Sequence, residues 1–247
     1  MPYSSPPSLI QLTEVIRVAE QGMTRPILCR AEDGRRYYVK GQQTDRASLW
    51  REWIAGYMAL ALGLPIAPFV LVQANESVLR ELSVELRLLG STPAFGSAER
   101  ESVIWYENSL RDQVDVRVRQ AVLVFDWWVK NGDRQVGNTN MLWTSSSRQL
   151  AIIDHNQAFD EAFDKVAFVQ NHVFASDWNA LMADAELRAA WTHRLSEALI
   201  VARWACENAP AEWRWANTEQ DVPAAYDPEN ALRVLARCVE PDFWRVR

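Results

Sequence analysis

The sequence has no apolar run approaching the roughly 20 residues that a membrane-spanning helix needs. Its start, MPYSSPPSLI, lacks the positive-then-apolar pattern of a secretory signal. The three cysteines are too far apart to form a CxxC pair, and the three histidines lack the spacing of zinc ligands. We therefore expect a cytoplasmic protein with neither a disulfide framework nor a histidine-based zinc site.

An excess of positive charge is also missing. The chain has 26 basic and 32 acidic residues, which give a formal net charge of -6. Proteins that hold nucleic acid by bulk electrostatics need a concentrated basic surface, so we do not expect nucleic acid as the partner. The lack of a long apolar run leads us to expect no membrane partner either. At 247 residues, 49% of them hydrophobic, the chain is long enough to bury a large core.

The first hundred residues are rich in predicted strands. These strands are expected at 14–21, 26–31, 36–40 and 68–72. The Asp33-Gly34 pair predicts a tight hairpin between the second strand and the third. Apolar residues at helical spacing predict a helix over 45–63, which Gly63 and Pro65 would end.

Two further segments complete this half of the chain. Residues 76–89 are expected to form one helix, capped by Asn75 and ended by Gly90. The stretch GSTPAFGSA, at 90–98, is rich in Gly, Ser and Pro, so it is predicted to be a hinge.

The second half of the chain has a different pattern. A long amphipathic helix is predicted over 109–130, followed by a polar turn at 131–134. Two short strands are expected at 140–144 and 150–154, and helices from 176 onwards. The sequence therefore predicts an α+β fold with a β-rich N-terminal lobe, 1–95, and a helical C-terminal lobe, 96–247.

Five polar residues occur in the order that phosphoryl transfer requires. Kinases use a lysine for the α/β-phosphates, a carboxylate to fix it, a base or orienting group for the nucleophile, and two metal ligands. Asn138 follows Asp133 by five positions, and Asp154 ends an apolar strand sixteen positions further on. Upstream, Lys40 ends a predicted strand and Glu52 lies in the helix after it.

Each of these residues has an ordinary interpretation when it is taken alone. Lys40 could be a solvated strand end, Glu52 a surface carboxylate and Asp133 a turn residue. Asp154 is harder to dismiss, because a carboxylate after two isoleucines needs a partner or a metal. It is the ordered set that indicates the chemistry.

Four segments carry a resemblance to a known family. They are YYVKG, REWIAGYMALALGLPIAP, NGDRQVGNTNMLW and LAIIDHNQAFD. The sequence resembles the HipA-like kinase family, in its short single-module branch, through most of residues 15–160. DRQVGN is also similar to the DRHxxN loop of phosphoinositide kinases, which share the wider fold.

The resemblance implies a two-lobed, protein-kinase-like fold that uses ATP and Mg²⁺. By matching motif, Lys40 would hold the ATP phosphates and Glu52 would position Lys40. Asp133 would be the catalytic base, and Asn138 and Asp154 would bind Mg²⁺.

The nucleotide contacts implied by the resemblance depart from the protein-kinase pattern. There is no GxGxxG loop, so the turn that contains Gly22 and Thr24 would cover the phosphates. Phe95, in the predicted hinge, is expected to contact the nucleotide. Gln135 stands where relatives often carry His, and Asp154 is followed by His-Asn rather than Phe-Gly.

The resemblance favours transfer of the γ-phosphate to a Ser or Thr of a protein. Small-molecule and lipid acceptors stay open, as do transfer of a nucleotidyl group and a regulatory module that binds nucleotide without catalysis. HipA toxins pair with a DNA-binding antitoxin, so an antitoxin-like or other regulatory protein partner is a further expectation.

Overall fold

The computed structural model describes residues 7–19, 25–225 and 227–246. The chain divides into two compact units, each built from stretches that alternate along the sequence. The first comprises Met1–Trp53, Ala67–Glu101 and Glu207–Tyr226, and the second comprises Ile54–Ile66, Ser102–Cys206 and Asp227–Arg247. Within the described residues, no helix combines the length and the apolar character needed to cross a membrane.

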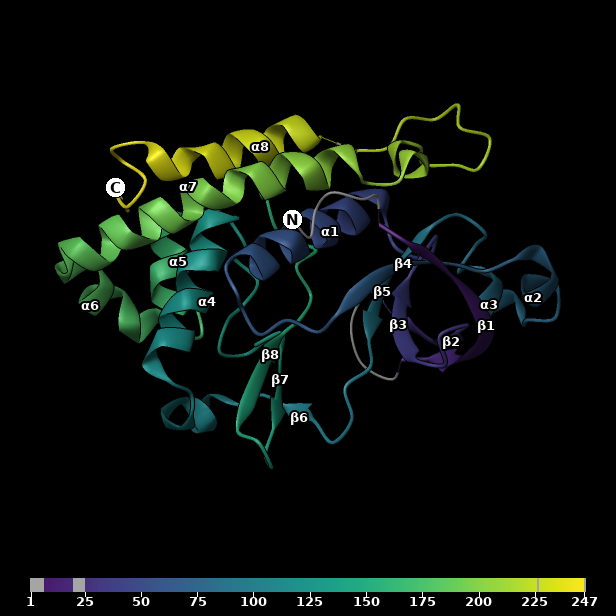
Figure 1. The fold of residues 1–247 in the computed structure, drawn as a ribbon, viewed down its shortest axis with the longest axis horizontal. Coiled ribbons are helices and arrows are strands. Elements are labelled where there is room, and N and C mark those ends of the chain that lie inside the picture. The colour runs from purple at the N-terminus through teal and green to yellow at the C-terminus, as the bar shows by residue number, and fades with distance from the viewer. Residues whose placement is uncertain (1–6, 20–24, 226, 247) are drawn as a thin grey trace. The chain divides into compact units, whose positions relative to one another are not determined.

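The first unit contains a closed barrel of five strands (Figure 1). Their order around the barrel is β1 (Leu9–Val18), β2 (Ile27–Ala31), β3 (Arg36–Lys40), β5 (Ala94–Ala98) and β4 (Phe69–Gln73). Neighbours are antiparallel except β1 and β4, which run parallel and close the ring. The strands predicted at 26–31, 36–40 and 68–72 are confirmed, whereas the first strand begins at Leu9, earlier than predicted.

Alternation of side chains along these strands fills the barrel with apolar groups. The buried residues include Leu12, Cys29, Tyr37, Val39 and Val72. The predicted hairpin between β2 and β3 is also present: Gly34 has a φ of 79°, and the Tyr37 hydroxyl donates to Oδ2 of Asp33 at 2.7 Å. This hairpin aligns β3, so that Lys40 lies at its end.

The prediction of a hinge at residues 90–98 is wrong. Ala94–Ala98 is strand β5, which pairs with β3 on one side and β4 on the other. Gly96 serves close packing here, since a Cβ at this position would lie 3.0 Å from Cγ1 of Val72. The segment is rich in Gly and Ser for two reasons. Gly90 has a φ of 73°, which favours glycine, and the small residues of β5 pack within the barrel wall.

The helix predicted over 76–89 is instead two short ones, α2 (Glu76–Arg80) and α3 (Val84–Arg87). Asn75 caps α2 as predicted, because its Oδ1 accepts a bond from the Val78 backbone N at 2.9 Å. Neither helix buries a residue. Without a packed face, a single longer helix has little to stabilise it.

The segment from Glu207 to Tyr226 belongs to the first unit, although it is distant in sequence. The Trp213 indole N–H, in the 3₁₀ turn η3 (Ala211–Arg214), donates to the Pro93 carbonyl at 2.7 Å. Two side chains of helix α1 (Arg46–Ala61) also bond to the segment: Arg46 donates to the Trp215 carbonyl and Trp50 to the Ala225 carbonyl. The segments of the two units therefore alternate along the chain. The lobes predicted at 1–95 and 96–247 divide the chain at one point only, and they stay a prediction.

The second unit contains an antiparallel sheet of order β6 (Ile104–Trp105), β7 (Met141–Thr144) and β8 (Gln149–Ile152). Its α-helices after α1 are α4 (Val116–Trp128), α5 (Lys165–Asn171), α6 (Trp178–Ala183), α7 (Ala185–Glu207) and α8 (Pro228–Ala236). Three 3₁₀ turns accompany them: η1 (Asn108–Gln113), η2 (Ala175–Asp177) and η4 (Arg237–Val239). The two strands and the late helices that the sequence predicts are confirmed.

Helix α4 is the centre of this unit's core. It begins at Val116 rather than in the preceding 3₁₀ turn, because Asp115 caps it by accepting the Arg117 backbone N–H at 2.7 Å. The indole N–H groups of Trp127 and Trp128 donate to carbonyls of the C-terminal segment, at Phe243 and Leu235. The chain is therefore α+β, with a strand-rich N-terminal part and a helical C-terminal part, as the sequence predicts.

Candidate active site

The first unit brings together Lys40 and Glu52. Lys40 is the last residue of β3, Glu52 lies on α1, and the Lys40 ammonium donates to Oε1 of Glu52. Only 7% of Lys40 and 2% of Glu52 is exposed, so neither is the solvated surface residue that its type alone suggests. A charge pair with this burial must be well aligned to offset the desolvation of both groups.

The predicted nucleotide contacts of the first unit have a mixed outcome. Phe95 on β5 pairs in register with Lys40, but its own ring is buried and stacks on Phe69 with the centroids 5.3 Å apart. The structure thus gives this ring a packing contact, and its contact with a nucleotide stays a prediction. Gly22 and Thr24 lie outside the described residues.

The second unit brings together Asp133 and Asn138. Oδ2 of Asp133 accepts one bond from Nδ2 of Asn138 at 3.0 Å and another from Nδ2 of Asn140 at 2.8 Å. The loop between them is closed by backbone bonds in both directions between Gln135 and Asn138, at 2.9 and 3.1 Å. The five-residue spacing therefore places the amide of Asn138 directly against the carboxylate of Asp133.

A fully buried arginine lies beneath this loop. Nε of Arg134 donates to Oδ2 of Asp126, on α4, at 2.7 Å. Its Nη1 donates to the carbonyls of Asn140 and Ile153, the second at 3.2 Å. One guanidinium therefore links α4, the end of the Asp133 loop and the residue that precedes Asp154.

Two further side chains complete the environment of Asp126. Nδ2 of Asn131 donates to its Oδ1 at 2.8 Å, and Nε2 of His172 lies 3.0 Å from its Oδ2. Burial by itself raises the pKa of Asp126, but the Arg134 charge and the His172 hydrogen bond lower it to about 2. The carboxylate is thus ionised across the physiological range.

The protonation of His172 follows from its surroundings. Burial lowers its pKa, an effect that the Asp126 carboxylate opposes, so the imidazole is neutral near pH 7. Its Nδ1 accepts the Phe174 backbone N–H at 3.1 Å. The ring proton is therefore on Nε2, where it is donated to Asp126.

Asp154 follows strand β8 and has a φ of 56°. A non-glycine residue in this left-handed region is uncommon and costs about 1 kcal/mol or more, and it persists only where neighbours fix it. Two contacts fix the preceding residue: the Ile153 backbone N donates to the Asn140 carbonyl at 3.0 Å, and Arg134 donates to the Ile153 carbonyl. The residue before Asp154 is therefore held by the same contacts that hold the end of the Asp133 loop.

Asp126 and His172 are not among the site residues that the sequence predicts. The available signal was a lone carboxylate inside VLVFDWW, the apolar end of α4, since a charge there must be paired. Arg134 lies in a polar turn, and nothing in its local sequence shows that it is buried. The three residues come from separate segments, so only the fold joins them.

Comparison with known proteins identifies the family of the chain. A family model described as HipA-like kinase matches residues 12–247. The chain belongs to the HipA-like kinase family. Membership makes this HipA-like kinase a phosphotransferase, as the sequence indicated. No curated protein matches the sequence.

One solved structure to which the chain shows a distant similarity is the crystal structure of a Helicobacter pylori proinflammatory kinase, CtkA. It is 12% identical to this chain, the alignment covers 94% of each chain, and the TM-score is 0.48.

Replacing Asp126 with Ala is expected to lower the free energy of unfolding by about 3–5 kcal/mol, because it leaves the Arg134 charge buried without its carboxylate. Urea unfolding measures the loss. The matched control is Glu76→Ala, which breaks an exposed ion pair with Arg80 and should change stability little. Similar losses in the two variants would show that the buried network does not hold the second unit together.

Proposed function

We propose that this chain transfers the γ-phosphate of ATP, with Mg²⁺, to an acceptor hydroxyl, and that the acceptor is a Ser or Thr of a protein. The buried ion pair of Lys40 and Glu52 carries the proposal. A lysine on a strand, fixed by a carboxylate on the next helix, is the group with which kinases bind the α/β-phosphates. Two charges are costly to bury, so their retention in the barrel unit indicates a function.

In this proposal Asp133 accepts or orients the proton of the acceptor hydroxyl. The amides of Asn138 and Asn140 both bind Oδ2 and hold the carboxylate in one orientation. Oδ1 takes part in neither bond and is the atom assigned to the hydroxyl. Most of the rate would come from positioning and charge neutralisation, because phosphoryl transfer needs little covalent chemistry from the protein.

The donor set at Asn138 and Asp154 fits Mg²⁺, which prefers carboxylate and amide oxygens. Since Nδ2 of Asn138 donates to Asp133, its Oδ1 is the atom assigned to the cation. Asp154 supplies a carboxylate at a strained strand end. Bound Mg²⁺ would offset the negative charge of the phosphates.

Cytoplasmic location and a protein partner that is antitoxin-like or otherwise regulatory are part of the same proposal. Mass spectrometry of the protein after incubation with MgATP tests the proposed transfer chemistry directly. A gain of phosphate supports a kinase, a gain of a nucleotidyl group supports the altered transfer chemistry, and no gain with retained MgATP binding supports a regulatory module. Phosphate found only on a small molecule would move the acceptor out of the protein class.

Lys40 and Glu52 should act as one unit, because the carboxylate fixes the flexible stem of the lysine. Lys40→Ala and Glu52→Ala are expected to lower the rate of phosphate transfer by similar factors, with the double variant little worse than either. Arg30→Ala, which breaks an exposed pair with Glu14 on the same barrel, is the control and should leave the rate unchanged. Multiplicative losses in the double variant would separate the roles of the two residues.

Asp154→Asn should remove the Mg²⁺-dependent part of the thermal stabilisation by ATP, because the amide lacks the charge that binds the cation. Thermal melts with ATP, with and without Mg²⁺, measure it. Asp160→Asn changes a carboxylate six positions further along the same loop and should keep the full Mg²⁺ effect. An Asp154→Asn protein that MgATP stabilises as much as it does the wild type would remove Asp154 from the metal site.

Asp133→Ala should keep nearly normal affinity for MgATP while transfer falls by about 10²- to 10⁴-fold, the usual contribution of a general base. Asn138→Ala should weaken Mg²⁺-dependent binding and transfer together. Calorimetry gives the affinity, and autophosphorylation gives the rate if no acceptor is known. Wild-type transfer by Asp133→Ala would contradict the assignment of the base.

A further inference from the structure

A pocket of ≈ 420 Å³ lies beside the Asp133 loop, within the second unit. Two segments line it: residues 105–109, from β6 into η1, and residues 136–139 of the loop itself. Asn138 belongs to both features, since it lines the pocket and donates to the Asp133 carboxylate at 3.0 Å. Whatever occupies the pocket is therefore next to the groups assigned to transfer.

The two walls of the pocket are fixed to each other. The hydroxyl of Thr139 donates to the Tyr106 carbonyl at 2.9 Å, and the Tyr106 backbone N donates to the Met141 carbonyl at 2.9 Å. The Tyr106 ring is buried and makes edge contacts with Trp143 and Phe174. The pocket thus has preformed walls, which lowers the ordering cost of binding.

The mouth of the pocket exposes large apolar side chains. Trp105 is 44% exposed and Val136 is 56% exposed, and each lines the pocket from a different wall. Among the nine lining residues the only charge is the carboxylate of Glu107, and none is a lysine or arginine. This chemistry suits an apolar side chain and disfavours a phosphate or another anion.

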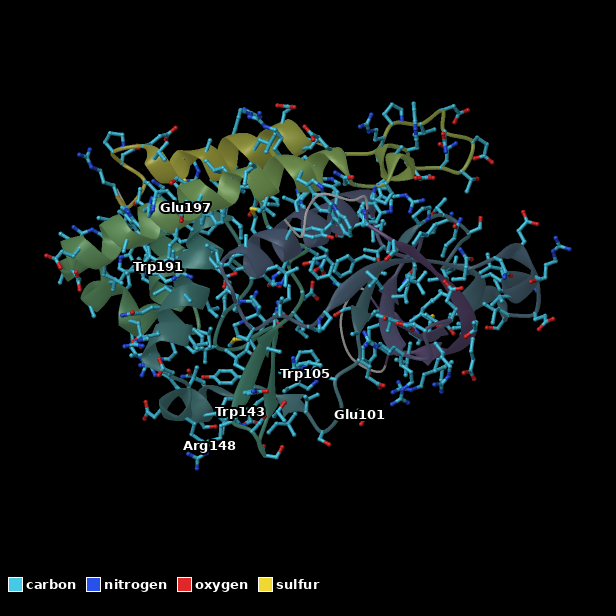
Figure 2. The ribbon with its side chains drawn as sticks, in the orientation of Figure 1. Glu101, Trp105, Trp143, Arg148, Trp191 and Glu197 are labelled. Atoms are coloured by element: carbon cyan, nitrogen blue, oxygen red, sulfur yellow. The ribbon has the colours of Figure 1, made fainter. Side chains whose placement is uncertain are left out.

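Strand β6 adds a feature that favours a polypeptide. It lies at the end of the sheet order β6-β7-β8, so one of its edges pairs with β7 and, among the described residues, no strand of this sheet pairs with the other. Figure 2 labels Trp105, on β6, and Trp143, on the neighbouring strand β7. An edge strand beside a side-chain pocket is one of the ways in which proteins bind an extended peptide.

We infer that this pocket binds the acceptor protein, and that it takes a large apolar side chain close in sequence to the phosphorylated Ser or Thr. The inference rests on the proposed function, and it names the feature by which the acceptor is recognised. Trp105 and Val136 contact the apolar side chain, while Glu107 disfavours acidic residues around it. Because an extended chain advances about 3.3 Å per residue, the apolar residue falls within a few positions of the hydroxyl.

The test uses a positional-scanning library of synthetic peptides with one central Ser or Thr and every other position varied in turn. Phosphate transfer from MgATP is measured for wild type, Trp105→Ala, Val136→Ser and the control Ile200→Ala. Ile200 is an exposed aliphatic residue on α7, outside the pocket. For each protein the readout is the ratio of transfer to the best apolar peptide and to its alanine counterpart, which does not depend on total activity.

Wild type and Ile200→Ala should prefer a large apolar residue at one position by about tenfold or more. Trp105→Ala and Val136→Ser should lose most of that preference. Equal ratios in all four proteins, or a wild type without apolar preference, would overturn the inference and leave the kinase proposal intact. So would a wild type that hydrolyses MgATP and labels no peptide.

Failure of the proposed function looks different. A wild-type protein that MgATP does not stabilise, and that neither hydrolyses ATP nor labels a peptide, would overturn both the kinase proposal and the acceptor pocket that rests on it. Melting temperatures of the two pocket variants, compared with wild type, show whether a lost preference reflects the missing side chain or an unfolded protein. Should Trp105→Ala unfold, the Val136→Ser ratio decides the question.

Discussion

The buried charge pair of Asp126 and Arg134 is the contact on which the geometry of the second unit depends. Through Arg134, helix α4 is joined to the carbonyls of Asn140 and Ile153. The first of these carbonyls ends the loop that carries Asp133, and the second immediately precedes Asp154. A single side chain thus fixes two segments that bear candidate catalytic groups. Desolvation largely cancels the attraction in such a pair, so its main effect is to define position rather than to add stability.

The contacts of Arg134 also account for two residues with left-handed backbone near the charge pair. Asn140 and Asp154 have φ values of 46° and 56°, and each is next to, or is itself, a residue whose carbonyl binds Arg134. Strain of this kind persists when the surroundings over-determine the backbone. In this loop the over-determination comes from charge-assisted hydrogen bonds, which are stronger than bonds between neutral groups.

Local patterns in the sequence were enough for strands β2, β3, β4, β7 and β8, for the hairpin at Asp33-Gly34 and for the order of the polar residues, but not for β5 and β6. The strands have the alternation that a barrel wall imposes, and the turn chemistry is local. The hinge prediction failed because Gly96 is needed for its small size against Val72, a neighbour on another strand. Asp126 and His172 were missed for a similar reason, since 46 positions separate them and only tertiary packing brings them into contact. Sequence composition reports the conformational preferences of each residue, whereas the roles of Gly96, Asp126 and His172 depend on residues that only the fold brings into contact with them.

The same loop connects the proposed chemistry with the proposed choice of acceptor. Between Asp133 and Asn138 it presents Val136 to the pocket, and at Thr139 it binds the opposite wall. The guanidinium of Arg134 donates to the Asn140 carbonyl and so holds the end of the loop. In the proposal, a side chain that fills the pocket meets a loop that hydrogen bonds hold at several points. An acceptor that does not fit would, under the same proposal, be displaced from Asp133, and displacements of about 1 Å can cost about 10²-fold in rate. The hydrogen bonds of this loop would thus let the shape of the pocket decide which acceptor hydroxyl reaches the proposed base.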